Sequence, residues 1–263
     1  VRLVIGVHAE EGASAAFLFR LEKGASLSLT WKLTGGDREG TCVLAAYYEL
    51  AEDARLHVSR LESGLTKTII YDQRHSVLAA RARADFYAAE LGGEKIIVHS
   101  YGKLSGDASE MNERAIYAGR GKQHLDFFYH IDHVGKKTKA EIDLKGALAD
   151  ESKKIFRGTL DFKRGCAGSV GDEGDFAIQL DPKTKNISLP LLLCTEDDVQ
   201  GNHASSAGQL DQNTIYFLMS RGFTLEEARR IVVEALIRPI IDGMDEALRE
   251  EVLNAVRMKL DRE

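Results

Sequence analysis

The chain has 263 residues, of which 44% are hydrophobic, so it can bury a sizeable core as one large β domain or two unequal ones. Its net charge of −6 at pH 7 provides no overall basic field, which argues against a nucleic-acid partner. The sequence also lacks the roughly 20-residue apolar stretch that spans a bilayer and the zones of a signal peptide, so we expect a cytoplasmic protein without a membrane partner.

From about residue 3 to residue 194, apolar and polar residues alternate in short runs that are separated by Gly, Asp, Asn or Lys turns. This period of two is typical of half-buried strands. The first proline is Pro182, so nothing before it prevents these runs from pairing as central strands. The clearest runs are Ser26–Trp31, Leu125–Ile131, Ala140–Leu144 and Thr159–Lys163.

Many short strands with almost no helical pattern between them are compatible with a sandwich, a barrel or a β-solenoid. We favour the solenoid because the runs continue for nearly two hundred residues without a hairpin dipeptide such as Asn-Gly. No strict repeat motif is visible, so the turns of the solenoid should be irregular.

The period changes after Asp198, and three amphipathic helices are predicted in the remainder of the chain. Asp211 is a candidate N-cap and Gly222 a candidate stop for the first helix. Thr224 and Glu227 form a capping box that opens a second helix, which runs toward Pro239. A third helix has one apolar face, and the small, polar segment 196–208 is interpreted as a junction. The predicted domains are therefore a β domain over 1–195 and a helical domain over 196–263. The apolar face of the third helix consists of Met244, Leu248, Val252, Val256 and Leu260.

One predicted strand carries two histidines and two aspartates on the same face: His124, Asp126, His130 and Asp132. Such a set is compatible with a metal site, for which His124 and His130 are the candidate ligands. A solvated outer face explains these residues equally well. His133 differs from His130 by three positions, so the two should point to opposite sides of the strand.

His203 lies in the Gly- and Ser-rich junction, where packing does not require a polar side chain. A metal ligand and a proton carrier are the functional alternatives. A histidine that caps a helix or bonds a carbonyl is the structural alternative.

The junction and tail contain several runs that together form a recognisable pattern. They are Glu196–Val199 to His203, Gly208–Gln212, Ile215–Phe223 and Glu226–Arg229, and upstream Asp150, Ser152, Phe156–Gly158 and Thr159–Phe162. This pattern resembles the SufB/SufD family of iron–sulfur cluster assembly proteins. It covers roughly residues 120 to 240.

This resemblance implies a right-handed parallel β-helix followed by a C-terminal helical subdomain. It also implies a non-enzymatic scaffold subunit that pairs with a second SufB/SufD-type subunit, as a homo- or heterodimer, and binds the SufC-type ATPase through its tail. His203 matches the family histidine at the subunit interface, where iron or an iron–sulfur cluster would bind transiently. The candidate residues for contact with the ATPase are Asp211, Phe217, Arg221, Gly222 and Phe223.

The chain also departs from the family pattern. Gly201 stands where SufD-like proteins often have Cys, and Ala204 stands where SufB-like proteins have Glu. Cys42, Cys166 and Cys194 are too few and too far apart for a disulfide framework or a CxxC site, and Cys166 and Cys194 do not match the scaffold cysteine position. These departures suggest a divergent or SufD-like member.

The alternative function is a carbohydrate-active or acyl-transferring β-helix enzyme. Such an enzyme should show a cleft lined by carboxylates or histidines on consecutive turns of the solenoid. The face that carries His124, Asp126, His130 and Asp132 is the one hint of such a cleft.

Overall fold

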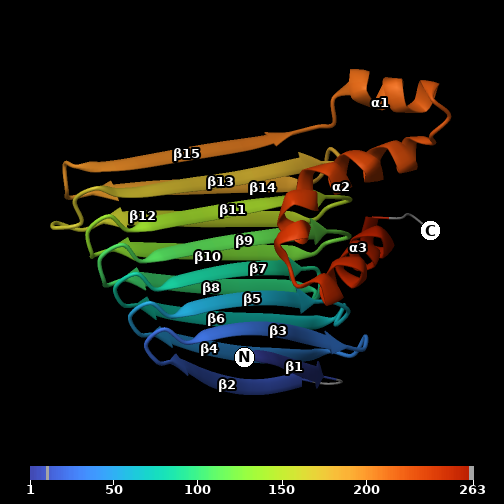
Figure 1. Cartoon of the computed structure of the whole chain (residues 1–263). Coiled ribbons are helices and arrows are strands. Elements are labelled where there is room, and N and C mark those ends of the chain that lie inside the picture. Colours follow the sequence, from blue (N-terminus) through green and yellow to red (C-terminus); the bar gives the residue numbers. More distant parts are fainter. Residues whose placement is uncertain (10–11, 261–263) are drawn as a thin grey trace.

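The computed structural model describes residues 1–9 and 12–260 and consists of two stacked parallel sheets with a helical tail (Figure 1). The chain alternates between the sheets, so that the odd-numbered strands form one sheet of eight and the even-numbered strands form one sheet of seven. Because every pairing is parallel and each strand lies beside the next strand but one, the fold is a β-solenoid. The predicted solenoid is confirmed.

The odd-numbered sheet contains, in order, β1 (Arg2–Ala9), β3 (Ser26–Gly35), β5 (Arg55–Glu62), β7 (Arg83–Glu90), β9 (Glu110–Gly119), β11 (Lys139–Leu148), β13 (Ser169–Gln179) and β15 (Val199–Gly208). The even-numbered sheet contains β2 (Gly12–Leu21), β4 (Gly40–Leu50), β6 (Thr68–Leu78), β8 (Lys95–Leu104), β10 (His124–His133), β12 (Lys153–Phe162) and β14 (Lys185–Cys194).

The alternation in sequence places one face of each strand in the lumen between the sheets. In β10, Leu125, Phe127 and Tyr129 are buried there, whereas His124 and Phe128 point outward and are half-buried. Successive strands stack in register, so each inward residue packs on an inward residue of the next turn. Apolar residues at these positions form one continuous core along most of the solenoid.

The lumen also contains charged side chains, which the strand pattern alone does not predict. Arg74 pairs with Asp72 at 2.7 Å and with Glu90 at 2.6 Å, and Arg60 also contacts Asp72. Burial raises the pKa of nearby Glu113 to about 7. Ion pairs in such a site add little net stability, but removing one partner is costly, so the network disfavours a shifted strand register.

Most of the segment 196–208, which the sequence analysis interprets as a junction, forms a strand in the structure. Residues Val199–Gly208 form β15, which pairs with β13 from Ser169↔Val199 to Ile178↔Gly208. The small residues here resemble a loop in sequence, yet parallel pairing with β13 requires only backbone groups. The solenoid therefore continues to Gly208.

The tail forms α1 (Gln212–Ser220), α2 (Leu225–Gly243) and α3 (Glu246–Leu260). Asp211 caps α1 and the Thr224–Glu227 capping box opens α2, as predicted. The second helix continues past the exposed Pro239 because Ile240 and Ile241 beyond it are buried. No described helix has both the length and the hydropathy that a membrane-spanning helix needs.

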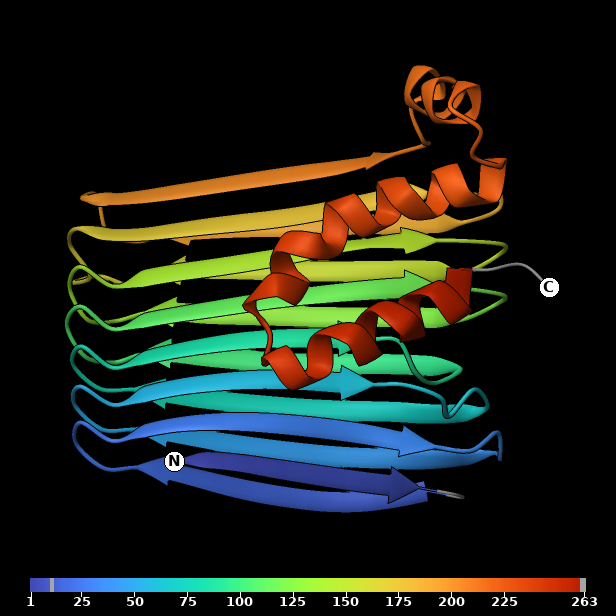
Figure 2. The ribbon, with the colours of Figure 1, turned by 45° about the vertical axis from the view of Figure 1, so that its right-hand side comes forward.

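The second and third helices lie against the outer face of the odd-numbered sheet (Figure 2). They bury an apolar cluster against strand residues such as Leu61 and Ile116. Polar contacts anchor the turn between the helices, because Asp245 pairs with Arg2 at 2.6 Å and accepts a hydrogen bond from Thr30 at 2.7 Å. The helix residues buried in the cluster are Ile237, Ile240, Ile241, Met244, Leu248, Val252 and Val256.

Close stacking should make Gly146→Ala strongly destabilising. A Cβ at position 146 would lie 2.1 Å from the backbone oxygen of Tyr117, so neighbouring strands would have to move. We expect a loss of about 1–3 kcal/mol in the free energy of unfolding, measured by chemical denaturation. Gly6→Ala is the matched control, because a Cβ there meets nothing within 4 Å, and its effect should stay within about 0.5 kcal/mol. Equal effects of the two changes would contradict this account.

Candidate functional site

The last turn of the solenoid is open. β15 pairs only with β13, and β14 pairs only with β12. The residues of β14 and β15 are half-buried or exposed, including those on the lumen side. The open end therefore presents both a lumen mouth and two strand edges with unpaired backbone groups.

His203 lies at this mouth. It is the register partner of Glu173, and in parallel strands register partners point to the same side of the sheet. Because Glu173 points into the lumen, His203 stands directly above it on the lumen side and is exposed. The structure thus places the histidine that the sequence singled out at the entrance of the solenoid.

Glu173 is an unusual neighbour for His203. Its side chain is buried, with the residue 3% exposed, and no side chain among the described residues hydrogen-bonds either carboxylate oxygen. Gly158 on the facing sheet provides the space, because a Cβ there would lie 1.9 Å from Oε1 of Glu173. A buried carboxylate without a side-chain partner suggests a binding role or a bound proton.

The environment of Glu173 favours the protonated form. Burial is the main cause, the charge of Asp175 adds to it, and the backbone of Leu191 opposes it only in part, which raises the pKa of Glu173 to about 7. At neutral pH this carboxyl group can therefore gain or lose a proton beside His203. The sequence does not reveal Glu173, because its partnership with His203 depends on the register of β13 and β15.

The three cysteines do not form a cluster. Cys42 and Cys166 are buried, and burial raises the pKa of both thiols. Cys194 is the exposed last residue of β14, at the open end of the solenoid. Gly201 and Ala204, which replace possible family ligands, offer no ligand atom in their side chains.

The residues proposed for ATPase contact lie on α1 and the turn after it. Asp211 accepts from the backbone N–H of Thr214 at 2.9 Å and thereby begins the helix. Gly222, with φ of +96°, ends it in the conformation that glycine favours. Phe217 and Phe223 are exposed, and the Arg221 guanidinium lies 4.6 Å from the Phe217 ring centroid.

The predicted metal face on β10 is only partly assembled. His124 and His130 both point outward, but they are six residues apart, about 20 Å along a strand. Asp126 contacts Arg157 of β12 instead of a histidine. His133 points into the lumen, on the side opposite His130 as predicted, and its Nδ1 lies 2.7 Å from Thr138 Oγ1.

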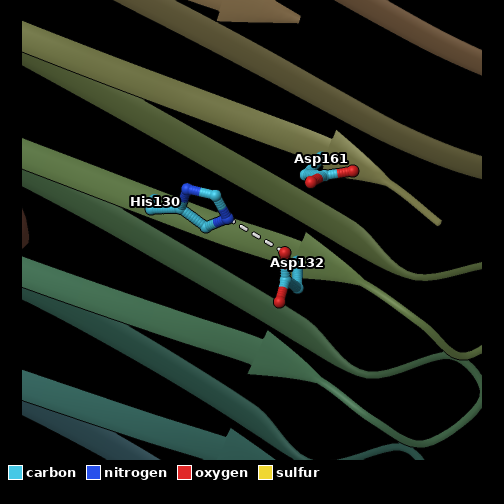
Figure 3. Close-up of side chains that lie close together, drawn as sticks. All are labelled: His130, Asp132 and Asp161. Carbon is cyan, nitrogen blue, oxygen red and sulfur yellow. Dashed lines mark hydrogen bonds and ion pairs between the residues drawn. The ribbon is translucent and has the colours of Figure 1, made fainter. Parts of the chain in front are cut away.

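His130 and Asp132 do come together, and Asp161 of β12 joins them (Figure 3). His130 Nε2 lies 2.9 Å from Asp132 Oδ1. The sequence pattern did not identify Asp161 as part of this group, because its place depends on the register of β10 with β12.

The raised pKa of Glu173 has a consequence for stability. The folded chain holds a proton on Glu173 at pH values where the unfolded chain has lost it, so this group's contribution to stability falls as pH rises from about 4.5 to about 7. Glu173→Gln cannot ionise. We therefore expect the thermal midpoint of Glu173→Gln minus that of the unmodified chain to increase as the pH rises from 5 to 8.

Asp172→Asn is the control, since Asp172 is the exposed neighbouring carboxylate on the opposite face of β13. Its midpoint should follow that of the unmodified chain across the same pH range. A Glu173→Gln curve parallel to that of Asp172→Asn would contradict the assignment.

Comparison with known proteins places the chain in a family. The family described as "SUF system FeS cluster assembly, SufBD core domain" matches residues 4–236. The chain is 26% identical over 204 residues to the iron–sulfur cluster assembly protein SufD of Bacillus subtilis, covering 77% of this chain and 46% of that protein. It is 25% identical over 216 residues to an iron–sulfur cluster assembly SufBD family protein of Mycobacterium leprae, covering 79% of this chain and 55% of that protein.

The SufD protein of Escherichia coli is 20% identical over 210 residues, which cover 79% of this chain and 50% of that protein. The chain thus spans about half the length of these relatives. A match over 4–236 includes the solenoid from β1 to β15, the open end with His203, and α1. The chain therefore belongs to the SufBD core-domain family of the SUF system for iron–sulfur cluster assembly.

Proposed function

We propose that this chain is a non-enzymatic scaffold subunit of a Suf assembly. It pairs through the open end of its solenoid with a SufB/SufD-type subunit and binds a SufC-type ATPase through α1 and the turn after it. Iron or a nascent iron–sulfur cluster binds transiently at the paired mouth, with His203 as a ligand. The observation that carries this proposal is the open last turn, which exposes His203 together with two unpaired strand edges.

The first helix supports the proposed ATPase contact. It projects beyond β15 instead of lying flat on the sheet (Figure 1), and Ile215 is its one buried residue. Leu218 is half-buried, and Tyr216, Phe217 and Met219 are exposed, Tyr216 by 76%. An apolar helix surface beside Arg221 has the composition of a protein-binding site. The exposed apolar residues in this region are Tyr216, Phe217, Met219, Phe223 and Leu225.

The outer face of β14 supports the proposed pairing. Four apolar side chains alternate along this edge strand and are exposed: Ile187, Leu189, Leu191 and Leu193. An exposed apolar edge strand favours pairing with another strand, and natural proteins usually protect such edges. A second solenoid placed end to end would cover β14 and β15 and enclose the mouth.

The chemistry of the mouth supports transient binding. Imidazole is a suitable ligand for iron, and the carboxyl group of Glu173 lies below it on the next turn. A single histidine cannot hold a cluster, so further ligands would come from the paired subunit.

The enzyme alternative would require the outward residues of β10 to converge on one cleft. His124 and Asp126 do not converge with His130 and Asp132 on the outer face of β10. A cavity of about 930 Å³ lies between α3 and the adjoining solenoid turns, away from this face.

The ATPase contact can be tested by mixing the chain with the SufC-type ATPase of its organism and measuring complexes by size exclusion with light scattering. We expect a stable complex that Arg221→Ala and Phe223→Ala each weaken by at least about tenfold, as for residues central to an interface. Met258→Ala, an exposed apolar change on α3, is the control and should bind normally. A folded chain that forms no complex at tens of micromolar would contradict the proposal.

The pairing surface can be tested with a charge placed on the edge strand. Leu191→Lys should abolish the paired species in the same light-scattering measurement, because a lysine on an edge strand opposes strand pairing. Ile69→Lys is the control, since Ile69 is an exposed apolar residue on the outer face of the central strand β6. Equal loss from both changes would argue against β14 as the interface.

The role of His203 is tested in the paired complex. His203→Ala should leave the pairing intact and lower the amount of iron that the complex retains after anaerobic loading and desalting. Unchanged iron retention would remove His203 from the site without affecting the proposed interfaces.

A further inference from the structure

A compact group of metal-ligating side chains lies on the outer face of the even-numbered sheet, and the proposed function does not use it. Asp132 of β10 and Asp161 of β12 are register partners, so they point to the same face from neighbouring strands. His130 lies two residues before Asp132 and shares that face. One ligand atom of each residue lies within 4.8 Å of the other two (Figure 3).

Two ionised aspartates this close together need a positive charge beside them. Each residue is 7% exposed, and like charges directly opposite each other on neighbouring strands are destabilising. Tyr101 donates a hydrogen bond to the Asp132 carboxylate, and His130 Nε2 lies 2.9 Å from its Oδ1, so both neighbours hold this carboxylate in place on the outer face.

The Lys163 ammonium supplies positive charge at this place. Its Nζ contacts Asp161 and lies 3.4 Å from Asp132. The Lys163 side chain is 44% exposed, whereas those of the two aspartates are 10% exposed, so the ammonium covers the carboxylates from the solvent side. A flexible side chain in that position can withdraw into water and let another cation take its place.

The imidazole is held in position. The ring of His130 stacks on that of Tyr101, with centroids 5.3 Å apart and an interplanar angle of 24°. Tyr101 in turn stacks on His75 and donates a hydrogen bond to Asp132. Two of the three ligands are thus oriented by the same tyrosine, as supporting residues commonly orient metal ligands.

We propose that His130, Asp132 and Asp161 bind a divalent transition-metal cation, which displaces the Lys163 ammonium. One imidazole nitrogen with two carboxylate oxygens favours Zn²⁺, Fe²⁺ or Mn²⁺ over the all-oxygen sites that suit Mg²⁺ and Ca²⁺. Three protein ligands also leave a position for water or for a group of a partner. This site is separate from His203 and does not depend on the proposed function.

The test is calorimetric titration of the full chain with Zn²⁺ and, separately, with Mn²⁺ near neutral pH. Each protein is titrated both with and without His203→Ala, so that ions bound at the open end are recognised. We expect one saturable site per chain, which His130→Ala weakens by at least about tenfold, the loss typical of perturbing a metal site. His124→Ala is the matched control, because it removes an outward histidine of the same strand, and it should not change the affinity.

The Lys163→Gln variant distinguishes two interpretations of this group, a metal site and an ion-pair cluster that binds no metal. Removing the competing ammonium should tighten Zn²⁺ binding severalfold. It should also lower the thermal midpoint of the metal-free protein, and saturating Zn²⁺ should restore that midpoint.

The proposal is overturned if Lys163→Gln shows no saturable binding of either ion, or if His130→Ala and His124→Ala bind equally well. Binding that disappears with His203→Ala and survives His130→Ala would assign the ion to the open end. Circular dichroism of each variant verifies that its fold is retained.

Discussion

In-register stacking of parallel strands is the constraint on which the rest of this structure depends. Each strand pairs with the strands of the turns before and after it, so a residue's surroundings are set by positions about one turn away in sequence. Glu173 lies below His203, and Asp132 lies beside Asp161, for this reason alone. The lumen network of Arg60, Asp72 and Arg74 depends on the same register, because its charges are buried and must meet.

The sequence predicts the architecture well because the architecture follows from local patterns. A period of two along nearly two hundred residues, without hairpin dipeptides, indicates a solenoid. The capping box at Thr224 and the N-cap at Asp211 mark helix starts through contacts within three residues. The exception is β15, whose small and polar residues resemble a junction, because its strand conformation comes from backbone pairing with β13.

The candidate sites were less predictable, since they depend on which residues become neighbours across turns. Period alone correctly placed His130 and His133 on opposite sides of the strand. It also grouped His124 with His130, although a fully extended strand keeps them far apart. Neither Glu173 nor Asp161 carries a local signal, and both emerge only when the register is known. His203 was singled out first by its Gly- and Ser-rich surroundings and then by the family pattern around it. The structure places it at the exposed mouth of the solenoid.

The docking of the tail has a mechanical consequence. The second and third helices cross the odd-numbered sheet over several turns, with α2 against β7, β9 and β11 and α3 against β5 and β9. Asp245 ties their connection to β1 and β3 through Arg2 and Thr30. A pull on α1 would therefore be divided between β15, which precedes it in the chain, and α2, which passes the force as shear to the turns that it covers. The tail thus acts as a brace that spreads a load over the turns from β5 to β11.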